Sequence, residues 1–244
     1  MTKKRTIIIG ASSEIAKALA VEVLTQLDDN LILISRTSNS DNLTNNSHVK
    51  QILVKDYSSQ AIAQAVSEIR QIKQQPITQV FICHGVLHSD DIQPEKRLED
   101  INCSSFQQVM ITNALTPILW LQQLTPLIAG DKPCKIVIFS ARVGSISDNR
   151  LGGWYSYRAS KAALNMMIKT SAIELARRAK NIKIIAFHPG TTDTQLSKPF
   201  QNNVPENKLF TCQFVAKQLL TIIDHIEIDH TASYVDWQGQ SINW

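Results

Sequence analysis

Tyr157 and Lys161 are the two side chains whose types and spacing point most directly to catalysis. They are four residues apart in Tyr157-Arg158-Ala159-Ser160-Lys161, so a helix would place both on one face. A phenol with a pKa of ~10 exchanges protons poorly near neutrality, but a neighbouring ammonium favours the phenolate and lowers that pKa. The pair could therefore protonate a carbonyl oxygen, or deprotonate an alcohol in the reverse direction.

The segment 10–16, which follows the first apolar run, is a candidate phosphate-binding turn. Such turns use glycines so that backbone N–H groups can approach a pyrophosphate at a helix N-terminus. The first residue is glycine, but Glu14 and Ala16 stand where two further glycines would be expected. An ordinary strand–turn–helix capped by Ser12 or Ser13 fits the pattern equally well.

Arg36 follows the second apolar run and bears on the choice of nucleotide. An acidic residue here would bind a ribose 2′-hydroxyl and repel a 2′-phosphate, whereas arginine pairs with phosphate. If the turn binds a dinucleotide, Arg36 favours NADP over NAD. The alternative is a solvated loop charge.

The elements that would position these residues alternate between strands and helices. Short, almost wholly apolar runs, typical of strands buried on both faces, lie at 6–9, 31–35, 51–54, 79–83, 135–139 and 183–187, with a last strand at 234–237. Ile15, Leu19 and Val23 recur with helical spacing, and longer helices are predicted at 105–128, 156–178 and 211–226. This alternation predicts an α/β fold, a Rossmann-like doubly wound parallel sheet of about seven strands with helices on both faces. Residues 1–244 are predicted to form a single domain in which the proline-containing stretch 189–210 is a substrate lid.

Composition argues against several other classes of protein. The chain has 244 residues, of which 43% are apolar, enough for one closed core. A net charge of +4 without a basic cluster on one face does not indicate nucleic-acid binding. No apolar stretch approaches the ~20 residues of a membrane helix, and no secretory segment precedes Gly10, so a cytoplasmic location is expected. The 4 cysteines and 6 histidines show no ligand spacing, so neither a metal site nor a disulfide framework is predicted.

The order and spacing of these motifs resemble the short-chain dehydrogenase/reductase family. The matching residues are Gly10-Ala11-Ser12-Ser13-x-Ile15, Asn113 in a central helix, Tyr157-x-x-x-Lys161, and Pro189-Gly190 after the sixth strand. Gly144-Ser145-Ile146 and the stretch from Tyr155 to Asn165 are most similar to a branch of carbonyl reductases related to the developmental signalling protein C-factor. The resemblance covers nearly the whole chain.

The resemblance implies a role for each matching position. Tyr157 would be the general acid/base, Lys161 would lower its pKa and hold the nicotinamide ribose, and Asn113 would support a proton-relay water and a helix kink. Pro117, four residues later, would also disrupt that helix. The cofactor implied is NADP(H), and the positions that would contact it are Gly10, Ser12, Ser13, Ile15, Arg36, Asp56, Tyr57, Gly85, Lys161, Pro189, Thr192 and Thr194.

The resemblance also implies a homodimer or homotetramer formed through the helices at 105–128 and 156–178. An apolar face with Trp120 and Met166 would suit such a contact, although core packing explains these residues as well.

The sequence departs from the family at the catalytic serine. The family places this serine three residues before Gly144, where this chain has Ala141. Losing one transition-state hydrogen-bond donor lowers a rate by ~10²–10³. Ser140 could replace it only if the strand end twists, because adjacent strand residues face opposite sides. Ser145 is a second candidate, and no replacement at all is the third possibility.

Two classes of function are compatible with these residues. The first is an NADPH-dependent oxidoreductase that transfers hydride to a small ketone, aldehyde or quinone carbonyl. The second is an NADP-binding regulatory or signalling protein with little turnover. Tyr157, Lys161 and Asn113 together favour the enzyme, whereas Ala141 and Glu14 favour the second class.

The substrate is only loosely indicated by two aromatic residues. Trp154 and Phe200, near or within the predicted lid, suggest an apolar or planar carbonyl compound unless they simply pack the lid. His84, before Gly85, departs from the family pattern, and its ring could intrude on the adenosine side.

Overall fold

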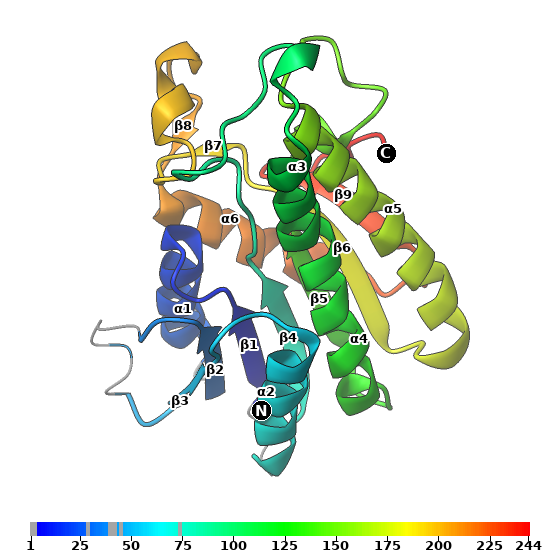
Figure 1. Cartoon of the computed structure of the whole chain (residues 1–244). Helices are drawn as coiled ribbons and strands as arrows, with labels where there is room; N and C mark the ends of the chain where they lie inside the picture. The colour runs from blue at the N-terminus through cyan, green and yellow to red at the C-terminus, as the bar shows by residue number, and fades with distance from the viewer. Residues whose placement is uncertain (1–3, 28–29, 39–42, 44–45, 73–74) are drawn as a thin grey trace.

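A seven-stranded parallel sheet forms the centre of the structure, a computed structural model that describes residues 4–27, 30–38, 43, 46–72 and 75–244 (Figure 1). The strand order is β3-β2-β1-β4-β5-β6-β9. The strands are β1(Arg5–Ile9), β2(Asn30–Ser35), β3(Val49–Leu53), β4(Ile77–Ile82), β5(Cys134–Phe139), β6(Ile182–His188) and β9(Ala232–Asp236). The predicted doubly wound sheet is confirmed, and its winding reverses where β1 pairs with both β2 and β4.

Successive residues of a strand point to opposite faces of the sheet, and here both sets are apolar, so helices cover both faces. Ile8 and its neighbours on one face pack against α1(Glu14–Leu27) and α6(Cys212–His225). Ile7 and its neighbours on the other face pack against α2(Ser59–Gln71), α4(Thr116–Ile128) and α5(Tyr155–Arg178). Figure 1 shows these two helical layers on either side of the sheet. Trp120 is fully buried in the second layer, so of its two possible roles core packing is the one found, and it is not part of an exposed oligomer face.

The helix predicted at 105–128 is interrupted in its middle. It divides into α3(Cys103–Met110), a π-helical turn η3(Ile111–Leu115) and α4. Asn113 lies in the π-helical turn, consistent with the expected kink there. Pro117 lies in the first turn of α4, directly after the π-helical turn, so the regular α-helix is interrupted just before the proline, as expected.

The loops after the carboxyl ends of the strands gather along one rim of the sheet. They carry the short helices η2(Leu98–Asp100), η4(Arg142–Gly144) and η5(Lys198–Asn203), and the paired strands β7(Thr191–Thr192) and β8(Leu209–Phe210). No helix in the described part of the chain is long and apolar enough to cross a membrane.

Candidate active site

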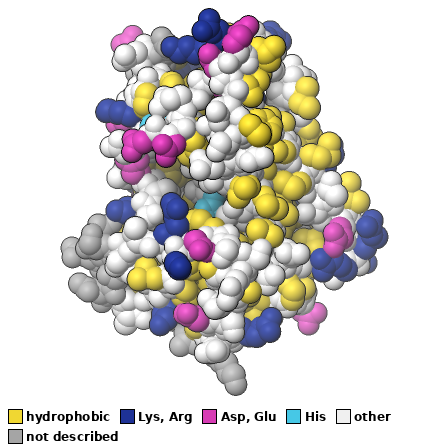
Figure 2. All heavy atoms as spheres, in the orientation of Figure 1, with side chains coloured by type: hydrophobic (Ala, Val, Ile, Leu, Met, Phe, Trp, Pro, Cys, Tyr) yellow, Lys and Arg dark blue, Asp and Glu magenta, His cyan; other side chains and the backbone are white. Residues whose placement is uncertain are grey.

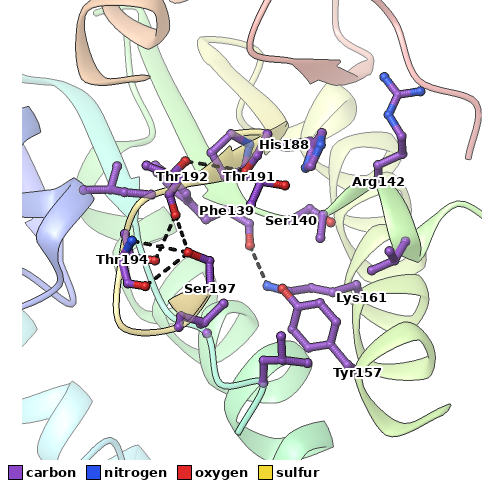
Figure 3. A pocket seen from close by; sticks show the side chains of 18 of the residues that line it. Phe139, Ser140, Arg142, Tyr157, Lys161, His188, Thr191, Thr192, Thr194 and Ser197 are labelled. Carbon is purple, nitrogen blue, oxygen red and sulfur yellow. Dashed lines mark hydrogen bonds between the residues drawn. The ribbon is translucent and has the colours of Figure 1, made fainter. Parts of the chain in front are cut away.

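A cavity of about 330 Å³ lies at the carboxyl ends of β1, β4, β5 and β6 (Figure 3). The cavity brings together these predicted site residues: Ser13, Ile15, Gly85, Ser140, Tyr157, Lys161, Pro189, Thr192 and Thr194. Gly10, Ser12, Arg36, Asp56, Tyr57 and Asn113 do not line it. Three of the four catalytic candidates (Ser140, Tyr157 and Lys161) and those expected near the nicotinamide therefore share one space, whereas Asn113 and the adenosine-side candidates lie outside it.

Tyr157 and Lys161 lie on one face of the first turns of α5, as the spacing predicts. The Lys161 Nζ is 5.8 Å from the centroid of the Tyr157 ring and donates a hydrogen bond to the Phe139 carbonyl at 2.9 Å. Burial lowers the pKa of Lys161 to about 7. Burial, with a smaller effect of Tyr234, holds the pKa of Tyr157 well above its usual range. The expected lowering of the phenol pKa is therefore not found, and Tyr157 is protonated at neutral pH.

Gly144 allows the chain after β5 to press directly against α5. A Cβ at this position would lie 2.7 Å from the Lys161 Cβ and 2.8 Å from its carbonyl carbon, closer than real atoms approach. The absence of a side chain at Gly144 therefore sets how near Ala141 lies to the Tyr157–Lys161 pair. Tyr234 supports the same segment by donating its hydroxyl to the Ala141 carbonyl at 2.7 Å.

Each candidate serine already has a hydrogen-bond partner away from the position of Ala141. Ser140 lines the cavity (Figure 3), but its Oγ donates to the Asn165 Oδ1 at 2.6 Å in the interior. The Ser145 side chain is buried, shares a hydrogen bond with Ser147 at 3.3 Å and does not line the cavity. Ala141 itself lines the cavity and presents only a methyl group there.

His188 and Arg142 line the cavity and were not predicted as site residues. His188 ends β6 beside Asp236 of β9, and its buried Nδ1 has no hydrogen-bond partner among the described residues. Burial, and then the charge of Arg142, lowers the His188 pKa to about 4. Arg142 binds Asp236 at 2.9 Å and Asp148 at 3.4 Å. The one sequence signal was the histidine directly before Pro189, at the end of a predicted strand.

The turn after β1 has the conformation that a phosphate-binding turn requires at its start. Gly10 has φ +77°, and a Cβ there would lie 3.3 Å from the Cys83 backbone. The Ser13 Oγ accepts a hydrogen bond from the Ala16 N–H at 3.4 Å. The Glu14 Oε2 accepts the Gln195 backbone N–H at 2.8 Å, so this carboxylate is bound to the predicted lid.

Two of the adenosine-side candidates, Arg36 and Tyr57, lie next to His84 at the edge of the cavity. The Arg36 guanidinium carbon is 5.4 Å from the Tyr57 ring centroid, and Tyr57 meets His84 edge-on at 4.3 Å. Burial, with Arg36 next, lowers the pKa of His84 to about 3, so this ring is neutral. Asp56 is exposed, and its Oδ1 accepts the Ser58 N–H at 2.9 Å, which forms the turn before α2.

Asn113 ties the loop after β4 to α5. Its Oδ1 accepts the Val86 N–H at 2.7 Å, and its Nδ2 donates to the Val86 carbonyl and to the Ser160 Oγ at 2.8 and 3.0 Å. Ser160 in turn donates to the Tyr157 carbonyl at 2.8 Å. The buried amide of Asn113 thus links the loop at Val86 to the helix that carries Tyr157 and Lys161.

Aromatic side chains form the wall of the cavity beside Tyr157. The Trp154 ring centroid is 6.1 Å from that of Tyr157 and 5.0 Å from that of Phe200 in η5. His88 meets Phe200 at 5.8 Å, and its Nε2 lies 3.2 Å from the Gln195 carbonyl oxygen. Both Trp154 and Phe200 line the cavity while they pack the predicted lid. Among the described residues, no group of three or more His, Cys, Asp or Glu side chains could hold a metal ion.

A doubly wound parallel sheet with a Tyr-x-x-x-Lys pair lining a cavity at its carboxyl rim defines an oxidoreductase of the short-chain dehydrogenase class. The sequence profile described as "short chain dehydrogenase" matches residues 4–205, and the chain belongs to this family.

Two curated proteins are among its relatives. The chain is 27% identical over 189 residues to 1-hydroxy-2-glutathionyl-2-methyl-3-butene dehydrogenase of Rhodococcus sp. (strain AD45), covering 78% of each chain. It is 26% identical over 147 residues to C-signal of Myxococcus xanthus, covering 60% of this chain and 83% of the relative. The predicted resemblance to the C-factor-related branch is therefore confirmed.

Solved structures of carbonyl reductases have the same fold. The carbonyl reductase Sniffer of D. melanogaster superimposes with a TM-score of 0.84 at 20% identity, covering 100% of both chains. An NADPH-bound carbonyl reductase from chicken fatty liver superimposes with a TM-score of 0.80 at 16% identity, also over 100% of both chains. At these identities the likeness establishes the fold alone.

Proposed function

We propose that this protein is an NADPH-dependent reductase of small ketones, aldehydes or quinones in which Tyr157 is the general acid/base. The observation that carries the proposal is the pairing of the half-buried Tyr157 with the buried Lys161, which line one cavity at the carboxyl rim of the sheet. The chicken neighbour named as an NADPH-bound carbonyl reductase agrees with this reaction class.

The residues present fit a nicotinamide dinucleotide. At Gly85 a Cβ would stand 3.8 Å from the Lys161 Nζ, so the missing side chain leaves a cradle beside that ammonium for a ribose. We assign the diphosphate to Gly10, Ser12, Ser13 and Ile15, the 2′-phosphate to the exposed Arg36, the adenine to Asp56 and Tyr57, and the nicotinamide carboxamide to Pro189, Thr192 and Thr194. When bound, the reduced nicotinamide supplies the hydride.

The chain's own residues then manage the proton. Tyr157 is protonated at neutral pH because it is buried, so its hydroxyl donates to the carbonyl oxygen during reduction. Lys161, held by the Phe139 carbonyl, stabilises the resulting phenolate when it carries a charge. Asn113 keeps α5 in place through Ser160. No serine hydroxyl assists, because Ser140 donates to Asn165 and position 141 is alanine.

The cavity wall favours an apolar, planar carbonyl substrate. Trp154 and Phe200 present their rings to the cavity, with Leu87 and Val143 also on its lining. Flat apolar groups bury the most surface against such rings.

The deciding experiment is a titration of the protein with NADPH and with NADH, followed by a panel of carbonyl compounds. Tight NADPH binding, weak NADH binding and turnover that is lost in Tyr157→Phe support the enzyme. The absence of binding of either nucleotide at millimolar concentration would overturn the proposal.

A second candidate function is an NADP-binding regulatory or signalling protein with little turnover, which the alanine at position 141 favours. The name of one relative, C-signal, agrees with a signalling function of this kind. Binding of NADPH without turnover, together with a biological activity that survives Tyr157→Phe, would establish it in place of the enzyme.

We also propose that the protein assembles as a homodimer or homotetramer through α4 and α5. Figure 2 shows hydrophobic side chains gathered over α3, α4 and α5 on one face. Four apolar side chains are 45–66% exposed, namely Ile111 and Leu115 of η3 and Met166 and Ile173 of α5. Exposed apolar side chains that gather in one patch are typical of an interaction surface. Light scattering after gel filtration tests this, and a monomer at micromolar concentration would contradict it. The cytoplasmic location stays a prediction.

A further inference from the structure

Glu95 is a buried carboxylate in the loop before η2, and the mechanism above does not use it. It is 4% exposed, and no ion pair in the described part of the chain includes it. Its Oε2 accepts the Ser156 backbone N–H at 3.1 Å, and its Oε1 accepts the Ser156 hydroxyl. Ser156 lies in the first turn of α5, directly before Tyr157.

The chain enters α5 through a turn of three successive left-handed residues. Gly152, Gly153 and Trp154 have φ values of +65°, +66° and +52°. This conformation is strained for a tryptophan, so surrounding contacts must hold it. The Trp154 N–H donates to the Glu95 carbonyl at 2.5 Å, and a Cβ on Gly153 would lie 3.4 Å from that same oxygen. Glu95 thus holds the turn through its main chain and the following helix through its side chain.

This turn places two parts of the proposed active site. The Trp154 ring lies between Tyr157 and Phe200 of the predicted lid, at 6.1 and 5.0 Å from their ring centroids. Tyr157 follows Ser156 on the helix, so a shift of the first turn moves the phenol relative to Lys161. Movements of about 1 Å at a catalytic group reduce rates by as much as ~10²-fold.

A carboxylate suits this position for two physical reasons. The first N–H groups of a helix lack intrahelical partners and carry partial positive charge, so a buried anion is stabilised there without a cation. Two carboxylate oxygens can also accept both Ser156 donors at once, whereas an amide offers one acceptor and two donors.

We propose that Glu95 is a positioning residue for Tyr157: it fixes the first turn of α5 and the Trp154 wall so that the phenol faces the substrate carbonyl. This inference rests on the proposed reductase function. By this inference Glu95, which does not line the cavity, orients both the Tyr157 hydroxyl and the Trp154 ring.

The test compares Glu95→Gln, Glu95→Ala and Ser156→Ala with the wild type and with Glu99→Gln. Glu99 is an exposed carboxylate in η2 of the same loop and is the matched control. We expect kcat to fall about 10-fold in Glu95→Gln and about 100-fold in Glu95→Ala, with KM and the NADPH Kd within about threefold of wild type. The double variant Glu95→Ala/Ser156→Ala should be no slower than Glu95→Ala, because both changes break one network.

A kcat for Glu95→Ala equal to that of Glu99→Gln would overturn the inference. So would a loss explained wholly by unfolding at the assay temperature or by loss of NADPH binding.

A fluorescence measurement tests the same inference without turnover. The Trp154 emission, taken as wild type minus Trp154→Phe, should shift to longer wavelength in Glu95→Ala and remain unchanged in Glu99→Gln. An unchanged spectrum in Glu95→Ala would overturn the inference. A shifted spectrum in a protein that reduces no carbonyl would instead refute the proposed function and leave the placement of Trp154 supported.

Discussion

Replacing Ala141 by serine should raise the rate of carbonyl reduction by about 10- to 100-fold. Ala141 lines the cavity with its methyl group, and its carbonyl is held by the Tyr234 hydroxyl at 2.7 Å. The backbone is therefore fixed, and the substitution adds only an Oγ beside the Tyr157–Lys161 pair.

The size of this effect follows from one new hydrogen bond. A hydrogen bond to a group that gains charge contributes about 1.5–3 kcal/mol, equivalent to roughly 10- to 150-fold in rate. Established donors of this kind are worth ~10²–10³. We expect about 10- to 100-fold, below the effect of an established donor, because a newly introduced Oγ at position 141 has no partner described that would orient it.

The assay is kcat/KM for the best substrate of a carbonyl panel at saturating NADPH, with the NADPH Kd measured separately. Ser140→Ala is the control, because the Ser140 hydroxyl donates to Asn165 in the interior. That variant should lose about 1 kcal/mol of stability and change kcat/KM less than threefold. An unchanged rate in Ala141→Ser, with a ~10²-fold loss in Ser140→Ala, would refute the reasoning and make Ser140 the substrate donor.

Three further predictions concern stability and cofactor binding. His84 and His188 have folded pKa values of about 3 and about 4, below the usual 6.5. As the pH drops from 6.5 to 4, these histidines are protonated in the unfolded chain before they are protonated in the folded one, so the free energy of unfolding should fall. Urea titrations at several pH values measure this fall, which should be less steep in His188→Asn. Glu14→Gln removes a negative charge at the phosphate-binding turn and should tighten NADPH binding about three- to tenfold at low salt, an effect that must vanish at high salt. Gly144→Ala should lower the free energy of unfolding by about 1–3 kcal/mol in a denaturant titration, because its Cβ would lie 2.7 Å from the Lys161 Cβ, and an unchanged value would show that the two segments separate freely.

The strands and the pairing of Tyr157 with Lys161 could be predicted because both depend on residues that are close together in the sequence. A strand buried on both faces must be apolar throughout, as in Ile7, Ile8 and Ile9 of β1. Two residues four apart on a helix must share a face, which places Tyr157 beside Lys161. These features need no knowledge of what packs against them.

The remaining features depend on partners distant in the sequence. The π-helical turn at 111–115 puts Asn113 against Val86, and no local pattern specifies that contact. For Trp120 the sequence left core packing and an oligomer contact equally open, because an apolar helix face indicates burial without showing whether a core or a partner covers it. The pKa of Tyr157 was predicted too low because the charge of Lys161 was considered without the burial of the phenol.

The cavity is assembled from five separate stretches of the chain, at 13–15, 83–87, 139–143, 154–161 and 188–204. These stretches flank the point where the winding of the sheet reverses, so neither half of the sheet contains the whole lining. An unfolded or half-folded chain therefore lacks this binding cavity. A cofactor that occupies this cavity stabilises only the complete fold, and by mass action a 100-fold excess over its Kd would add about 2.7 kcal/mol to the free energy of unfolding. If the proposed nucleotide binds here, its concentration in the cell would set part of the stability of the fold, independently of any turnover.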